Sequence, residues 1–284
     1  MSPIPPPSDT PPSAQGQIVA PDGVPLAWYR WDPPGKSRGT VCLHHGHGEH
    51  AGRYHHVARA FARAGFAFLA FDARGHGRSG GPRGHSPSYA RLLDDLDLVL
   101  ARAPAGPRLL YGHSMGGQIV LTRLLRDSGG FSGAIITGAW LRLAFPAPAG
   151  KVLLARLLYA LAPSVTLPTQ LEQAALSRDP AVVAAYAADP LVHDRISFRL
   201  GIDLLDGGTS ILRRAGELRT SLLLMHGEAD RIMDCAATRT VHDRAGSTDK
   251  TLRLWPGLYH EIHNEPEWET VVEVATRWAR AHVA

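Results

Sequence analysis

The segment RLLYGHSMGGQIVLTRLLRD, residues 108–127, indicates the type of fold to expect. Its first part, RLLYGH at 108–113, is a short apolar run that predicts a strand, and its last part, 115–126, has apolar residues at the spacing of a helix. Between them, a serine at a sharp strand-to-helix turn needs a positive φ and neighbours with almost no side chain. Gly112 and Gly116 meet that need two residues to either side of Ser114. The segment therefore predicts a nucleophile elbow with Ser114 at its tip.

Short apolar runs recur on both sides of this segment, as expected for strands buried on both faces of a parallel sheet. They are TVCLHH at 40–45, FAFLAF at 66–71, SGAIITG at 132–138, TSLLLMHG at 220–227 and TLRLWPG at 251–257. Helix-patterned segments lie among them at 53–65, 87–103, 115–126, 235–245 and 267–283. IVA at 18–20 and LAWYRW at 26–31 flank a PDG turn and predict an edge pair of strands. The alternation predicts an α/β fold with a mostly parallel central sheet and helices on both faces.

The alternation stops after Gly138 and resumes near residue 211. Residues 139–210 instead consist of helix-like pieces punctuated by prolines. We therefore expect residues 15–138 and 211–284 to form the core and residues 139–210 to form an inserted helical cap. Residues 1–14 are rich in proline and predict a flexible tail.

Composition excludes several classes of partner and location. The net charge is +4 and the pI is about 9.3, but the basic residues are scattered, which argues against nucleic-acid binding. Cys42 and Cys235 are too far apart to suggest a disulfide framework or a metal motif. The N-terminus lacks a signal-peptide pattern, and the apolar stretch 152–162 is too short for a bilayer and contains Arg156. We expect a soluble, cytoplasmic protein; its oligomeric state stays open.

A serine hydroxyl is almost un-ionised at neutral pH, so it needs a histidine base and a carboxylate that orients the base. In this type of fold the chain order is serine, acid, histidine. Asp230 directly follows the run at 220–227, and His260 directly follows the run at 251–257. These two residues are the predicted acid and base. The alternatives are Glu228 and Asp234 for the acid, and His242 and His263 for the base.

The loop HHGHGEH at 44–50 follows a predicted strand, where a glycine-rich loop can turn a backbone amide toward the nucleophile. Gly46 and Gly48 would permit the close approach. We expect the amides of His47 and Met115 to form an oxyanion hole. The crowded histidines also raise the alternative of a metal site, but no HExxH pattern accompanies them and neighbours on a strand point to opposite faces. We therefore expect no metal and no cofactor.

Several motifs together resemble those of the monoacylglycerol lipase and lysophospholipase branch of the α/β-hydrolases, which is of the S33 serine aminopeptidase type. They are HGHGEHAGRY at 45–54, FDARGHGRSGGPRGH at 71–85, GHSMGG at 112–117 and HEIHNE at 260–265. The likeness runs from about residue 15 to the C-terminus. It implies the α/β-hydrolase fold with an inserted helical cap, a Ser-His-Asp triad, no cofactor and a small-molecule acyl ester as substrate.

The resemblance also implies roles outside the triad. Glu49, Arg53 and His263 match residues that line the glycerol-binding end of the family's site, although Glu49 and Arg53 could instead pair to brace their loop. The apolar stretch 152–162 would supply a wall of the acyl tunnel or a surface for transient contact with membranes or micelles. His47 stands where the family often has a small residue, and the cap does not align, so acyl chain length and leaving group stay open.

The expected reaction is hydrolysis of monoacylglycerols to fatty acid and glycerol through an acyl-enzyme. A general carboxylesterase or a lysophospholipase of the same fold is the alternative within this class. A hydrolase-like protein that binds a small ligand with little turnover is the alternative from another class. Measuring the turnover of monoacylglycerols and of other esters distinguishes these three hypotheses.

Overall fold

We describe the protein from a computed structural model, whose described residues are 4, 11–146 and 148–283. Most of the segment predicted as a flexible tail, 1–14, lies outside these residues. The strands are β1 (Ala14–Val19), β2 (Pro25–Trp31), β3 (Thr40–His44), β4 (Ala67–Phe71), β5 (Arg108–His113), β6 (Gly133–Thr137), β7 (Thr166–Pro168), β8 (Arg195–Ser197), β9 (Leu222–Gly227) and β10 (Lys250–Trp255). The α-helices are α1 (His55–Arg63), α2 (Tyr89–Leu100), α3 (Met115–Arg126), α4 (Ala149–Leu161), α5 (Pro180–Ala188), α6 (Phe198–Arg214), α7 (Cys235–Arg244) and α8 (Trp268–Ala281). Short 3₁₀ helices are η2 (Ala51–Tyr54), η3 (Gln173–Ala175), η4 (Ala215–Glu217) and η5 (Ile262–Asn264).

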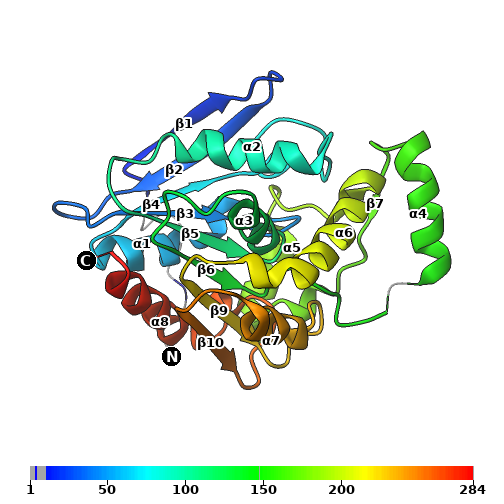
Figure 1. Ribbon diagram of the computed structural model, residues 1–284. Helices are drawn as coiled ribbons and strands as arrows, with labels where there is room; N and C mark the ends of the chain where they lie inside the picture. The colour runs from blue at the N-terminus through cyan, green and yellow to red at the C-terminus, as the bar shows by residue number, and fades with distance from the viewer. Residues whose placement is uncertain (1–3, 5–10, 147, 284) are drawn as a thin grey trace.

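The main sheet, within the described residues, has the strand order β1-β2-β4-β3-β5-β6-β9-β10 (Figure 1). Strands β4, β3, β5, β6, β9 and β10 pair in parallel in that order, whereas β1 pairs antiparallel with β2 and β2 antiparallel with β4. The predicted mostly parallel sheet with an antiparallel edge pair is therefore confirmed. In a parallel sheet the carboxyl ends of the strands meet at one edge, so loops that follow β3, β5, β9 and β10 converge there.

Side chains alternate between the two faces of the sheet, and each face packs on helices. On β5, Leu110 belongs to a core cluster with residues of α2, α3, α6 and α7. Its neighbours Leu109 and Tyr111 belong to a second cluster with residues of α1 and α8. Because helices cover both faces, the central strands are buried throughout, which explains their uniformly apolar sequence.

The segment expected to form the cap, 139–210, contains α4, α5 and most of α6, and also the antiparallel pair β7–β8. These two strands have three residues each, too few to produce a periodic pattern in the sequence. Helix α6 runs past residue 210 to Arg214, and its buried residues join the core cluster of α3. α6 packs on both α3 and α4, so it connects the core to the outlying helix α4 (Figure 1).

Candidate active site

Ser114 lies at the turn between β5 and α3, with φ 52°, in the left-handed region that favours glycine. Hydrogen bonds hold this conformation: the Ser114 amide donates to Thr137 O (3.0 Å), and the Ser114 carbonyl accepts from the Trp140 amide (2.9 Å). Ser114 precedes α3, but its hydroxyl does not cap the helix. The hydroxyl is therefore available for chemistry, at the first turn of a helix.

The glycines around the elbow are required by space. A Cβ on Gly112 would lie 2.6 Å from the carbonyl oxygen of Gly116, and a Cβ on Gly116 would lie 1.9 Å from His44 O. A Cβ on Gly46 would lie 3.2 Å from the Cβ of Ser114. The loop after β3 thus passes directly against the serine.

His260 and Asp230 contact each other at the carboxyl ends of β10 and β9. The Nδ1 of His260 lies 2.7 Å from Oδ2 of Asp230. The other oxygen, Oδ1, accepts the amides of Ile232 (2.7 Å) and Met233 (3.0 Å). Because an ionised carboxylate only accepts, Nδ1 of His260 carries the hydrogen and Nε2 keeps a lone pair. A histidine in this tautomer can accept a proton through Nε2.

The two groups also shift each other's pKa. Burial alone would lower the pKa of His260, but the charge and hydrogen bond of Asp230 outweigh it, and the pKa lies above the ordinary value of 6.5. Burial alone would raise the pKa of Asp230, but the charge of His260 and the hydrogen bonds of His226 and His260 hold it well below the ordinary value of 3.8. Asp230 is therefore ionised at neutral pH and increases the basicity of His260.

The alternative acids and bases lie in other environments. Asp234 caps α7 through the Ala236 amide and pairs with Arg142, and Glu228 is exposed. His242 lies in the last turn of α7 and contacts Asp243. His263 is fully buried, stacks on Tyr54, and finds no hydrogen-bond partner for its ring among the described residues.

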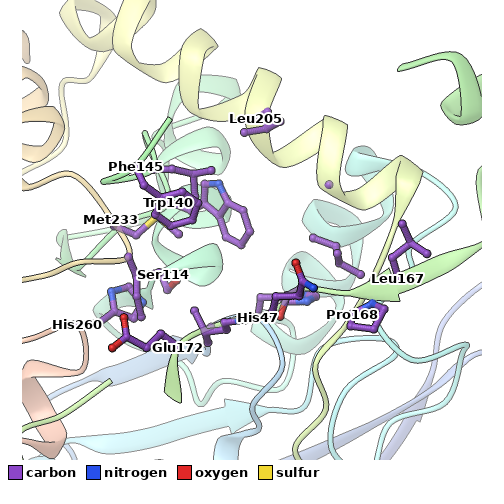
Figure 2. Close-up of a pocket in the computed structure, with 18 of the residues that line it drawn as sticks. His47, Ser114, Trp140, Phe145, Leu167, Pro168, Glu172, Leu205, Met233 and His260 are labelled. Atoms are coloured by element: carbon purple, nitrogen blue, oxygen red, sulfur yellow. Dashed lines mark hydrogen bonds between the residues drawn. The ribbon is translucent and has the colours of Figure 1, made fainter. Parts of the chain in front are cut away.

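Ser114, His260 and His47 border one cavity, which has a volume of about 760 Å³. Figure 2 shows Ser114 and His260 side by side at one end, with Leu167 and Pro168 farther along. Most of the remaining wall comes from 140–176 and 196–205 and is mainly apolar, with Trp140, Phe145, Val152, Leu154, Ile202 and Leu205 among its residues. A serine at the end of an apolar chamber can meet a substrate with a long hydrocarbon part.

The predicted oxyanion donors lie on two sides of Ser114. Met115 is the first residue of α3, and amides in the first turn of a helix have no partner within the helix. His47 lies in the loop after β3, where the Gly46 amide donates to Oε1 of Glu49 (2.7 Å). The His47 ring is fixed separately, because its Nε2 donates to the carbonyl oxygen of Arg195 (3.0 Å). These contacts order the loop next to the serine.

The residues predicted to bind a glycerol group are placed differently from one another. Glu49 borders the cavity, whereas Arg53 and His263 are not among the described residues that border it. Arg53 lies behind Glu49 and pairs with it (2.7 Å), as in the bracing alternative. It also pairs with Glu261 (2.6 Å), the residue after His260.

Two residues of the site had no counterpart in the sequence reasoning. His226, at the end of β9, places Nε2 3.0 Å from Oδ2 of Asp230, while its Nδ1 contacts Thr238 Oγ1 (2.7 Å). Glu261 lies next to His260 and borders the cavity. His226 lies four residues before Asp230 in MHGEAD, and this short spacing was the available signal for its role. Glu261 gave no such signal, because its partner Arg53 is 208 residues away in the chain.

Among the described residues, no group of three or more histidine, cysteine, aspartate or glutamate side chains is arranged to hold a metal ion. Of the crowded histidines at the end of β3 and in the following loop, His44, His45 and His47 contact backbone carbonyls, whereas His50 pairs with Asp189 (2.8 Å). The Nδ1 of His45 donates to the carbonyl oxygen of Gly46 (2.7 Å), and its Nε2 accepts from the Ala73 amide (2.9 Å). His44 Nδ1 lies 3.0 Å from the carbonyl oxygen of His45.

Comparisons with known proteins identify the family of the chain. A family model described as serine aminopeptidase, S33, matches residues 35–267. The chain is 40% identical over 266 residues to a monoacylglycerol lipase of Mycolicibacterium smegmatis, covering 92% of this chain and 95% of that protein. It is 33% identical over 255 residues to the monoglyceride lipase of Homo sapiens, covering 87% and 84% of the two chains.

The crystal structure of a monoacylglycerol lipase of Paleococcus ferrophilus has the same fold, with a TM-score of 0.85 and 33% identity. The match covers 90% of this chain and 99% of that one. The chain therefore belongs to the S33 serine aminopeptidase family of α/β-hydrolases, in the branch that includes the monoacylglycerol lipases, and is a carboxylic ester hydrolase.

Proposed function

We propose that the chain hydrolyses monoacylglycerols to fatty acid and glycerol, with Ser114 as nucleophile, His260 as base and Asp230 as orienting acid. The observation that carries the proposal is a serine on a strained elbow that shares an apolar cavity with a histidine bound to a buried carboxylate. Two relatives support the choice of substrate. They are 40% and 33% identical to this chain and are named as a monoacylglycerol lipase and a monoglyceride lipase.

In the proposed reaction, Ser114 Oγ attacks the ester carbonyl while Nε2 of His260 takes the hydroxyl proton. The amides of Met115 and His47 donate to the oxyanion of the tetrahedral intermediate. His260 then gives its proton to the departing alcohol, and an acyl-enzyme remains. Water, activated by the same histidine, attacks the acyl-enzyme and releases the fatty acid.

The two parts of a monoacylglycerol fit the two parts of the cavity. The apolar wall formed by Trp140, Phe145, Leu205 and their neighbours suits the acyl chain. Near Ser114 the cavity is also bordered by the polar residues His47, Glu49 and Glu261, and a polar end of this kind suits a small polyol. We assign no direct substrate contact to Arg53 or His263, because neither borders the cavity.

We further propose that α4 contacts lipid surfaces transiently. None of the side chains of α4 is buried. Leu153, Leu157 and Leu161 are spaced four residues apart, so they share one face of the helix, and they are 73%, 58% and 72% exposed. None of the helices among the described residues combines the length and apolar character that crossing a bilayer requires. An exposed apolar stripe beside the acyl cavity suits a surface from which acyl substrates are drawn.

We also propose a cytoplasmic location. Cys42 and Cys235 are free thiols, which a reducing compartment preserves. Fractionation of cells that produce the tagged chain tests this, and recovery of the active enzyme in the medium would contradict it.

The first experiment labels the purified protein with a fluorophosphonate probe and locates the adduct by peptide mass spectrometry. In parallel, glycerol release is followed from 1-monoacylglycerols of increasing chain length. Ser114→Ala should lose both the adduct and glycerol release. Ser128→Ala, at an exposed position after α3, is the matched control and should retain both.

The possible results separate the candidate functions. An adduct on Ser114 together with glycerol release supports the proposal. An adduct without glycerol release leaves a serine esterase whose substrate is another ester, such as a lysophospholipid. Full activity of the Ser114→Ala variant would refute the triad. A wild-type protein that binds esters and turns over once or not at all would be a binding protein.

A further inference from the structure

Arg53 is the centre of a buried cluster of charged side chains behind the cavity. Its Nη1 donates to Oε2 of Glu49 (2.7 Å), and its Nη1 and Nη2 donate to the two oxygens of Glu261 (2.6 Å each). The Arg53 side chain is 10% exposed, and those of Glu49 and Glu261 are each 3% exposed. The planar guanidinium matches the Glu261 carboxylate as a two-point fork and still reaches Glu49.

The two carboxylates belong to the two loops that carry the proposed chemistry. Glu49 lies in the loop after β3, and its Oε1 accepts the amide of Gly46, the residue before His47. The hydroxyl of Tyr54 donates to the same oxygen (2.6 Å). Glu261 follows His260 directly, and its Oε2 also accepts from Nδ2 of Asn264 (2.8 Å). Arg53 is thus bonded to the oxyanion loop on one side and to the histidine loop on the other.

We infer that Arg53 is a positioning residue that holds the oxyanion loop and the His260 loop in register around Ser114. The inference rests on the proposed function, because it assigns a task only if those loops act in ester hydrolysis. Arg53 acts through Glu49 and Glu261 and does not meet the substrate. The ring of Tyr186 covers the guanidinium, with 4.7 Å from the guanidinium carbon to the ring centroid, and Tyr186 itself borders the cavity.

Charge balance explains why a cation is needed at this point. Burial raises the pKa of Glu49, whereas Arg53 outweighs burial at Glu261 and lowers its pKa to about 2. Without the guanidinium, two buried carboxylates would face each other with no cation between them. They would have to separate or take up a proton, and either change moves the Gly46 contact or the residue next to His260. A shift of about 1 Å in a catalytic group can cost on the order of a hundredfold in rate.

The test compares Arg53→Met and Arg53→Lys with wild type on two esters of the same fatty acid, its 1-monoacylglycerol and its ethyl ester. Arg53→Met should lower kcat on the order of a hundredfold on both esters alike, with KM changed less than about twofold. Arg53→Lys, which keeps the charge but not the fork, should recover part of the loss on both. The rate of fluorophosphonate labelling at Ser114 should fall by the same factor as kcat.

Controls distinguish positioning from general damage. Arg123→Met removes an ion pair of similar length with Asp97, 2.6 Å, in α3 away from the loops, and should leave both rates unchanged. In a double-mutant cycle, Glu261→Gln should cost about as much as Arg53→Met, and the combined variant should cost little more than either. If circular dichroism shows that Arg53→Met does not fold, Arg53→Lys carries the test. Its kcat should then be lower than that of the wild type by the same factor on both esters.

Three results would overturn the inference. One is wild-type kcat for the folded Arg53→Lys and Arg53→Met variants. Another is a loss confined to the monoacylglycerol with a raised KM, which would make Arg53 a contact for the glycerol group. The third is additive losses for Arg53 and Glu261. A wild-type protein that neither labels at Ser114 nor hydrolyses either ester would instead overturn the proposed function, and this inference with it.

Discussion

Replacing two leucines on the outer face of α4 should weaken lipid binding while leaving the chemistry intact. Burying a whole leucine side chain stabilises by about 1.5–3 kcal/mol. Leu153 and Leu161 are 73% and 72% exposed, so nearly three quarters of each side chain is free to insert. The pair should therefore contribute about 3 kcal/mol to insertion, which is on the order of a hundredfold in the partition coefficient. Glutamine is the replacement, because it favours helix about as well as leucine.

The assay is co-sedimentation of the Leu153→Gln/Leu161→Gln variant with phosphatidylcholine vesicles, together with two activity measurements. Hydrolysis of a long-chain monoacylglycerol in micelles should fall, while hydrolysis of a soluble short-chain ester should stay at the wild-type rate. Val19→Gln is the matched control, since Val19 is 63% exposed but lies in β1 at the other side of the molecule (Figure 1). Wild-type partitioning of the double variant, or an equal loss on both esters, would refute the reasoning.

Three other predictions concern the triad and the elbow. Asp230→Asn should lower kcat on the order of 10⁴-fold, because the amide no longer holds the proton-accepting tautomer of His260; retention of more than a tenth of kcat would contradict this role. His260 must be neutral to accept a proton and its pKa is raised, so kcat/KM should fall as pH drops through a value above 6.5, and in Asp230→Asn this limb should move to lower pH. Gly116→Ala should destabilise by about 3 kcal/mol in thermal melts and lose activity, because its Cβ would lie 1.9 Å from His44 O, whereas Gly150→Ala, with nothing within 4 Å, should do neither.

The sheet and the elbow could be read from the sequence because both depend on local pattern. The strand predicted at 108–113 and the helix predicted at 115–126 have the same bounds as β5 and α3. Glycines at 112 and 116 are a local requirement of one backbone turn, so they show in the sequence as a motif. Long buried runs and helical periodicity are likewise properties of neighbouring residues.

The region from 139 to 210 was less predictable. β7 and β8 are too short to show a period, and they pair only because the chain returns through α5. The role of α6 in the core depends on which face of the helix meets α3 after folding. Propensity describes single segments, whereas these features depend on the fit between segments.

The amino-acid sequence determined the α/β class, the elbow and the choice of Ser114, Asp230 and His260 as candidates, since strands, turns and chain order are encoded in adjacent residues. The tertiary structure alone decided that Arg53 faces Glu261, 208 residues away, that His226 and His260 share Asp230, and that His263 is buried and does not border the cavity. Contacts at such separations depend on how the loops at one edge of the sheet meet in space. No local sequence pattern specifies these contacts, because each contact depends on how segments pack against one another after folding.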